Sequence, residues 1–98
     1  MIEVKRGTDR ITIKGHAGYA DAGNDIVCAA VSALAQTLIR SIEDLTETKI
    51  EYDISSGWID IKHGILSERA SVLIESFFIG VYMAAEEYPD CVKILSEH

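Results

Sequence analysis

The chain has 98 residues, of which 48% are hydrophobic and 26% charged, with a formal net charge of −7 and a pI near 4.8. This length suits one folded domain, which we expect to span residues 1–98. The negative charge repels phosphate backbones, so it argues against a nucleic-acid partner and favours a basic protein partner. We see no uninterrupted apolar run of the roughly 20 residues that a membrane span needs, and no signal-peptide pattern. We therefore expect a cytoplasmic protein without membrane contact.

The metal-ligating and redox-active residues are few and scattered. The cysteines are Cys28 and Cys91, and the histidines are His16, His63 and His98. In a reducing compartment the two cysteines are expected to stay unpaired. No close pair has the spacing of zinc ligands, so we predict no metal site and no cofactor.

The first third of the chain predicts a hairpin followed by a loop. Residues 2–5 and 10–14 alternate as half-buried strands do, and Gly7-Thr8-Asp9 reads as the turn between them. Residues 15–23 contain three glycines and little apolar periodicity. Such a stretch predicts a loop that is long enough to be functional.

A long amphipathic helix should follow, starting near Asn24 or Asp25, because either side chain can cap it. Apolar residues then recur at spacings of three and four, which indicates the face that packs on the core. The predicted stripe consists of Val27, Val31, Leu34, Leu38, Ile42 and Leu45.

The rest of the chain repeats this order of elements. Residues 49–54 and 58–62 alternate as a second strand pair, a second helix is predicted from a Ser67 cap to Tyr88, and residues 92–95 are predicted to add a short strand. The second helix should bury Leu66, Ala70, Leu73, Phe77, Val81, Ala84 and Tyr88. The order ββαββα(β) predicts an α+β two-layer sandwich, in which two long helices cover a mostly antiparallel sheet.

Cys28 and His16 are the best candidates for chemistry. Cys28 should lie in the first turn of the first helix, where main-chain amides and the helix dipole stabilise a thiolate and can receive an oxyanion. His16 follows a strand, and the loop can bring its imidazole to the thiol as a general base. Asp25 either caps the helix or orients His16, and Ser32 is either bonded within its own helix or a polar neighbour of the thiol. Because a helical cysteine is often a small buried hydrophobe, these residues alone leave packing open as the alternative.

Two segments carry a family resemblance: Gly15-His16-Ala17, and the run Gly23-Asn24-Asp25-Ile26-Val27-Cys28-Ala29-Ala30-Val31-Ser32-Ala33. Their pattern, a GHA, a short loop, then GxDIVCA followed by SA, resembles the ribosomal-processing cysteine proteases of the Prp family. The resemblance extends to chain length, the order of elements and the ending Glu86-Glu87-Tyr88, so it covers the whole predicted domain.

This resemblance implies a nucleophile at Cys28 and its partner at His16, with the motif aspartate and serine of the family at Asp25 and Ser32. It implies a homodimer that removes the N-terminal extension of a large-subunit ribosomal protein by cutting after phenylalanine. We expect the loop to cover the bound peptide, which Gly15, Ala17 and Gly23 would contact.

Two other functions fit the same residues. The chain could be a non-catalytic ribosome-assembly or protein-interaction module that binds the same basic protein, with Cys28 as packing. It could also be a thiol-redox protein, although it lacks a Cys-x-x-Cys pair.

Overall fold

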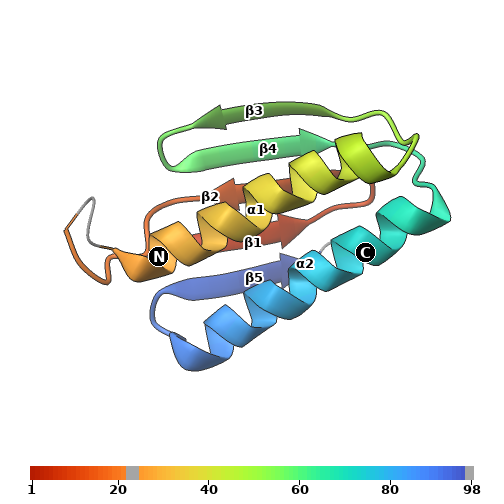
Figure 1. The fold of residues 1–98 in the computed structure, drawn as a ribbon. Helices are drawn as coiled ribbons and strands as arrows, with labels where there is room; N and C mark the ends of the chain where they lie inside the picture. Colours follow the sequence, from red (N-terminus) through yellow and green to blue (C-terminus); the bar gives the residue numbers. More distant parts are fainter. Residues whose placement is uncertain (22–24, 97–98) are drawn as a thin grey trace.

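A computed structural model describes residues 1–21 and 25–96. Five strands form one sheet in the order β3-β4-β2-β1-β5, and both helices lie on the same face of it (Figure 1). The elements are β1 (Ile2–Arg6), β2 (Arg10–Lys14), α1 (Ile26–Leu45), β3 (Glu51–Ser55), β4 (Trp58–Lys62), α2 (Glu68–Glu87) and β5 (Val92–Ser96).

Pairing in the sheet confirms the predicted α+β sandwich. β1 pairs antiparallel with β2, β2 with β4, and β4 with β3, while β5 runs parallel to β1 at the opposite edge. The register places Val4 opposite Ile13, and Ile13 opposite Ile59. These apolar side chains therefore share the face that the helices cover, which is why the period-two alternation of the sequence builds one core.

Helix α1 buries a stripe that differs in part from the predicted one. Ala35 and Ile39 are buried with the expected residues, whereas Leu45 is 59% exposed. At 100° per residue, Leu45 lies at the same angle as the buried Val27, and it is exposed because it is the last residue of α1. Leu34 lies on the flank of the stripe. Leu34 instead packs on α2 beside Gly80, where a Cβ atom would lie 2.8 Å from its Cδ2. Gly80 thus lets the two helices approach closely.

By length and composition alone, α1 is also the one helix in the described part of the chain that is apolar enough to cross a membrane. Its apolar residues do not form an uninterrupted run, because charged residues such as Arg40 and Glu43 lie among them. Here its apolar stripe packs on the sheet, as expected of the central helix of a two-layer domain.

Strand β3 differs from its prediction in bounds and in burial. It begins at Glu51, not at residue 49, and all five of its residues are exposed. Tyr52 and Ile54 pair with the buried Ile61 and Ile59, so they do point to the helix side, as their alternation predicts. They remain 43% and 48% exposed because β3 is the edge of the sheet.

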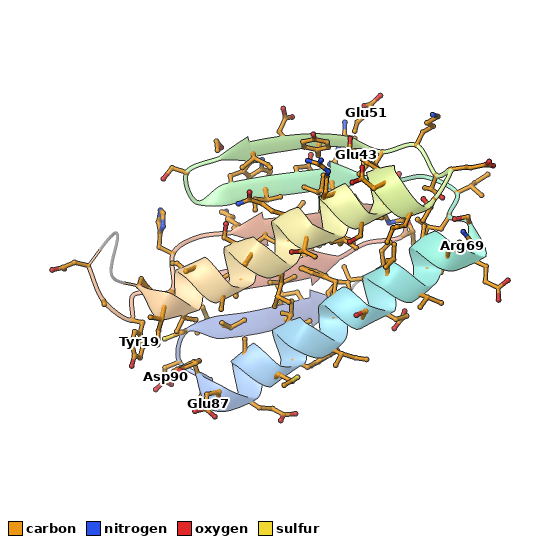
Figure 2. All side chains as sticks on the ribbon, viewed as in Figure 1. Tyr19, Glu43, Glu51, Arg69, Glu87 and Asp90 are labelled. Atoms are coloured by element: carbon orange, nitrogen blue, oxygen red, sulfur yellow. The ribbon has the colours of Figure 1, made fainter. Side chains whose placement is uncertain are left out.

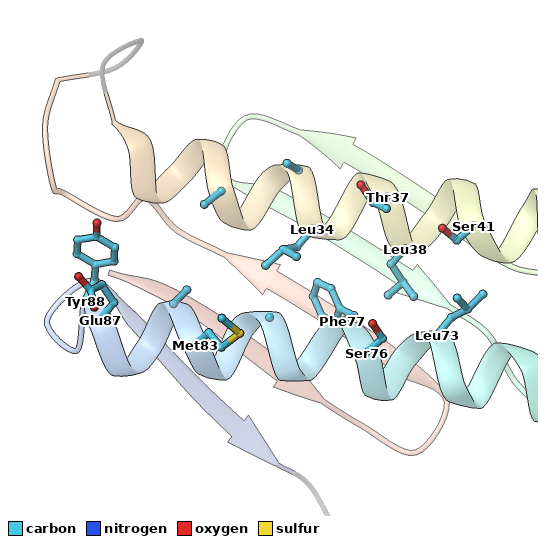
Figure 3. A pocket seen from close by; sticks show the side chains of 14 residues that line it. Leu34, Thr37, Leu38, Ser41, Leu73, Ser76, Phe77, Met83, Glu87 and Tyr88 are labelled. Carbon is cyan, nitrogen blue, oxygen red and sulfur yellow. The ribbon is translucent and has the colours of Figure 1, made fainter.

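Helix α2 begins at the predicted cap, with the Ser67 hydroxyl accepting the Ala70 N–H, and ends at Glu87, with Tyr88 as its C-cap. Ile74 and Phe78 are buried although the predicted stripe omitted them. Between α1 and α2 runs a groove of about 620 Å³, and the side chains of Leu34, Leu38 and Phe77 point into it (Figure 3).

Candidate active site

Asp25 organises the start of α1. It is the N-cap residue, with Oδ1 accepting the N–H groups of Val27 and Cys28 at 3.0 and 2.9 Å. Oδ2 accepts the N–H groups of Tyr19 and Ala20 at 3.0 and 3.3 Å. The bond from Cys28 N–H is the largest of the effects that hold the pKa of Asp25 below its ordinary value, against desolvation, which raises it. One carboxylate therefore caps the helix and ties the preceding loop to it.

Capping by Asp25 bears on the prediction that first-turn amides of α1 receive an oxyanion. The N–H groups of Val27 and Cys28 donate to the Asp25 side chain, and that of Ala29 donates to its carbonyl oxygen. These first-turn amides are thus already bonded and do not point unpaired into the site. Among the described residues, Asp25 makes no hydrogen bond to His16, so the structure supports its capping role and not the orienting one.

Cys28 is half-buried in the first turn of α1, and its sulfur has a main-chain donor. The N–H of Ala17 lies 3.1 Å from Sγ. Such a donor stabilises negative charge on sulfur, and it comes from the residue that follows His16. Both Cys28 and Cys91 are free, as predicted.

The turn between β3 and β4 supports His16. The imidazole is exposed, and its Nε2 end lies so close to Gly57 that a Cβ atom there would be 2.7 Å from Nε2. The N–H of Gly15 donates to the carbonyl oxygen of Gly57 at 2.9 Å. The end of β2 and the β3–β4 turn are thus bonded directly beside the imidazole.

Two cavities meet at His16, Cys28 and Ser32, which line both of them. The first has a volume of about 210 Å³ and is otherwise mostly apolar, with walls from Ile2, Ile13, Gly15, Val31, Ile54, Ser55, Ser56, Gly57, Trp58 and Ile59. The second, of about 510 Å³, is completed by Gly18, Ala20, Asp25 and Ala29. The thiol of Cys28 therefore borders two adjoining cavities, which share three of their lining residues.

The other predicted site residues have distinct positions. Ser32 accepts a hydrogen bond from Gln36 at 2.9 Å, so its hydroxyl is bonded to a side chain one turn on and lies beside the thiol. Gly15 has a φ of +100°, and a side chain there would overlap the carbonyl oxygen of Met1. The Ala17 side chain is buried, which leaves its main chain to face the sulfur. The predicted contact at Gly23 lies outside the described residues.

Tyr19 anchors the loop at its far side. Its ring meets that of Tyr88 edge to face at 5.4 Å, and Figure 2 places Tyr19 at the end of the molecule where Glu87 and Asp90 lie. This contact, together with the two bonds to Asp25, fixes residues 17–20 between the ends of the two helices.

Sequence reasoning missed the contribution of the β3–β4 hairpin. Ile54, Gly57 and Trp58 line the smaller cavity, although they lie far from His16 and Cys28 in the sequence. Trp58 is 39% exposed at the start of β4 and borders this cavity. The glycine of the Ser55-Ser56-Gly57 turn was the only signal, and by itself it indicates only a turn.

Comparison with known proteins gives one consistent result. The family model described as cysteine protease Prp matches residues 1–93. The ribosomal processing cysteine protease Prp of Mycoplasma genitalium is 28% identical over 101 residues, covering 99% of this chain and 97% of that protein. The Staphylococcus aureus protein of the same name is 26% identical over 87 residues, covering 86% and 82%.

Solved structures agree in fold. The crystal structure of an essential ribosomal processing protease Prp from S. aureus, in complex with a covalently linked product peptide, superposes with a TM-score of 0.94. It is 22% identical and covers 99% of this chain and 100% of its own. The site at the start of α1 and the family match thus agree: the chain belongs to the cysteine protease Prp family and is a cysteine protease.

Proposed function

We propose that the chain is an endopeptidase with a Cys28–His16 dyad that removes the N-terminal extension of a large-subunit ribosomal protein by cutting after phenylalanine. The observation that carries the proposal is the meeting of Cys28 and His16 on the walls of two adjoining cavities, with the Ala17 N–H on the sulfur. Among the described residues no hydrogen bond joins the imidazole to the thiol, so the dyad assembles fully when a peptide binds.

The reaction proceeds through an acyl-enzyme. His16 takes the thiol proton of Cys28, and the thiolate attacks the carbonyl carbon of the scissile bond. The carbon–nitrogen bond breaks, and the amine leaves with the proton from His16. Water, deprotonated by His16, then hydrolyses the thioester and restores the thiol. Because Asp25 already accepts the N–H groups of Val27 and Cys28, the Ala17 N–H is the donor that stabilises the charge formed at sulfur.

The smaller cavity suits an aromatic side chain before the scissile bond. Ile13, Val31 and Ile54 give it apolar walls directly beside Cys28, and its volume of about 210 Å³ is of the order that one aromatic ring fills. This supports cleavage after phenylalanine, the specificity that the family resemblance implies.

A ribosomal protein as the substrate is supported by charge and by relatives. The relatives are named ribosomal processing proteases, and the S. aureus structure holds a covalently linked product peptide. The net charge of −7 attracts a basic partner and disfavours nucleic acid. We also propose a cytoplasmic location without membrane contact, where such a substrate is made.

We propose further that the chain acts as a homodimer joined through its helical face. The outward side of α2 exposes Val72, Ile79 and Met83 at 61%, 63% and 65%, beside the groove between the helices. Large apolar side chains gathered on one face favour an interface.

The test is cleavage of a peptide that carries the Phe-Phe junction of the host ribosomal protein, read by mass spectrometry. Wild type should cut after the second phenylalanine. Cys28→Ala should abolish cutting, and His16→Ala should lower kcat by about 10²–10⁴-fold, with both variants folded by circular dichroism. Intact peptide after incubation with excess folded wild type would favour the binding module. Peroxide consumption without any peptide cleavage would instead favour the thiol-redox protein.

A further inference from the structure

The glycine of the β3–β4 turn lies against the imidazole at the site. The three atoms nearest to a Cβ at position 57 would all belong to His16: Nε2 at 2.7 Å, Cε1 at 3.2 Å and Cδ2 at 3.4 Å. A contact of 2.7 Å is shorter than carbon and nitrogen tolerate, so any side chain at position 57 would displace the ring. The imidazole therefore occupies the space that a side chain would take.

Gly57 is also bonded to the segment that carries the histidine. Its carbonyl oxygen accepts the N–H of Gly15, the residue before His16, at 2.9 Å. One residue thus sets the main chain next to the imidazole and leaves room for its ring. Gly57 has a φ of +69°, which glycine adopts without strain and other residues do not.

We propose that Gly57 is a positioning residue for the catalytic imidazole: the β3–β4 turn forms a seat on which the Nε2 end of His16 rests. This inference rests on the proposed function, because it concerns the base of the proposed dyad. The seat limits the positions that His16 can take relative to Cys28, whose sulfur is held separately by the Ala17 N–H. Displacing a catalytic group by about 1 Å costs about a hundredfold in rate.

The chain offers a matched control at Gly64. Gly64 also follows a strand of this hairpin and also has a positive φ, of +58°, but a Cβ there would meet nothing within 4 Å. Gly57→Ala and Gly64→Ala therefore impose the same kind of backbone strain, and only the first creates a contact with His16. Each glycine also lies beside a different histidine, because the ring of His63 is within hydrogen-bond distance, 2.9 Å, of the Gly64 carbonyl oxygen.

The kinetic experiment compares the three proteins at a temperature where circular dichroism shows all of them folded. Gly57→Ala should lower kcat by about a hundredfold with KM within about twofold of wild type, while Gly64→Ala keeps the wild-type kcat. Added to His16→Ala, the Gly57→Ala change should lower the residual rate no further, because its effect passes through the imidazole. Equal losses of kcat in both alanine variants, or a further loss in the His16→Ala background, would overturn the proposal.

A second experiment needs no peptide. The imidazole C–H signals of His16 and His63 are compared by NMR in the three proteins at one pH. Gly57→Ala should move the ring signals of His16 and leave those of His63 in place, whereas Gly64→Ala should leave the His16 signals in place. If the His16 signal does not move in Gly57→Ala, the proposal that Gly57 positions the imidazole is overturned. If wild type cuts no peptide, the proposed function fails, and this NMR comparison still decides whether Gly57 positions the ring.

Discussion

The main-chain N–H of Ala17 donates to the Sγ of Cys28 across 3.1 Å. This bond joins the residue after the candidate base to the candidate nucleophile, so it holds the strand end and the helix start together, and among the described residues no hydrogen bond joins the two side chains themselves. A second link between the same segments runs through Asp25, whose Oδ2 accepts the N–H groups of Tyr19 and Ala20. The two carboxylate oxygens of Asp25 thus have different partners, so their roles in the loop and in the helix cap can be tested separately.

Asp25→Asn should loosen the loop and spare the helix cap. The amide oxygen of asparagine can still accept from Val27 and Cys28, whereas its NH₂ group cannot accept from Tyr19 and Ala20. Hydrogen exchange at the amides of residues 19 and 20 should rise by up to about tenfold, with residues 27 and 28 unchanged. Asp25→Ala should raise exchange at all four amides, so a uniform rise in Asp25→Asn would contradict this division of roles.

Acid should weaken the cap in a defined direction. Because the pKa of Asp25 is held below its ordinary value of 3.8, the folded state binds fewer protons than the unfolded state, and this part of the stability is present above that value. It is lost as the pH falls through the lowered pKa. The Tm difference between wild type and Asp25→Asn should therefore shrink below about pH 4.

The Asp25→Asn comparison is needed because a second carboxylate behaves in the same way. The hydrogen bond from Arg6 lowers the pKa of Glu75 below its ordinary value of 4.5. Both variants keep Glu75, so its contribution cancels in the difference. A Tm difference that stays constant down to about pH 2.5 would show that Asp25 contributes no pH dependence.

Filling the smaller cavity should change specificity without unfolding the protein. Ile54 lines the cavity but is 48% exposed on an edge strand, so Ile54→Trp adds volume at the site and little strain in the core. We expect kcat/KM for a peptide with phenylalanine before the scissile bond to fall by about tenfold, and that for an alanine peptide to fall less. Equal losses for both peptides would mean that this cavity does not receive that side chain.

A charge on the outer face of α2 should dissociate the proposed homodimer. Ile79 is 63% exposed beside the groove, so Ile79→Lys buries a charge only if a second copy covers it. Sedimentation velocity should show a dimer for wild type and a monomer for this variant, at unchanged helical content. Ile65→Lys is the control, because Ile65 is 97% exposed and precedes α2. A monomeric wild type would refute the proposed homodimer. Dissociation by Ile65→Lys as well would show that the effect of Ile79→Lys does not locate the interface on α2.

Most of the fold could be predicted because local periodicity carries it. Each of these patterns lies within one helix or strand, and each prediction is confirmed. They are the alternation of Ile11 and Ile13 in β2, the helix caps Asp25 and Ser67, and the spacing of Val27 and Val31 in α1. Exposure of Ile54 could not be predicted, because alternation shows which face a side chain takes and not whether its strand lies at an edge of the sheet.

The candidate site was predictable only in part, for a similar reason. His16 and Cys28 belong to one motif, so they could be paired from the sequence. The contact of Gly57 with His16 is long-range and is made by a residue without a side chain, so no pattern of residue types records it. The sequence also did not predict that the Asp25 side chain accepts the first-turn N–H groups of α1. Asp25 could either cap the helix or orient His16, and only its hydrogen-bond partners distinguish these two roles.

The parallel pairing of β1 and β5 has a practical consequence for fusions. Ile2 lines the smaller cavity and Met1 lies against Gly15, so a tag attached ahead of Met1 would emerge beside the Cys28 thiol. Ser96 pairs with Arg6, at the other end of β1 from Ile2, so the two ends of the described chain lie at opposite ends of the sheet (Figure 1). An affinity tag after the last residue should leave peptide access free, whereas an uncleaved N-terminal tag would compete with substrate for the same entrance.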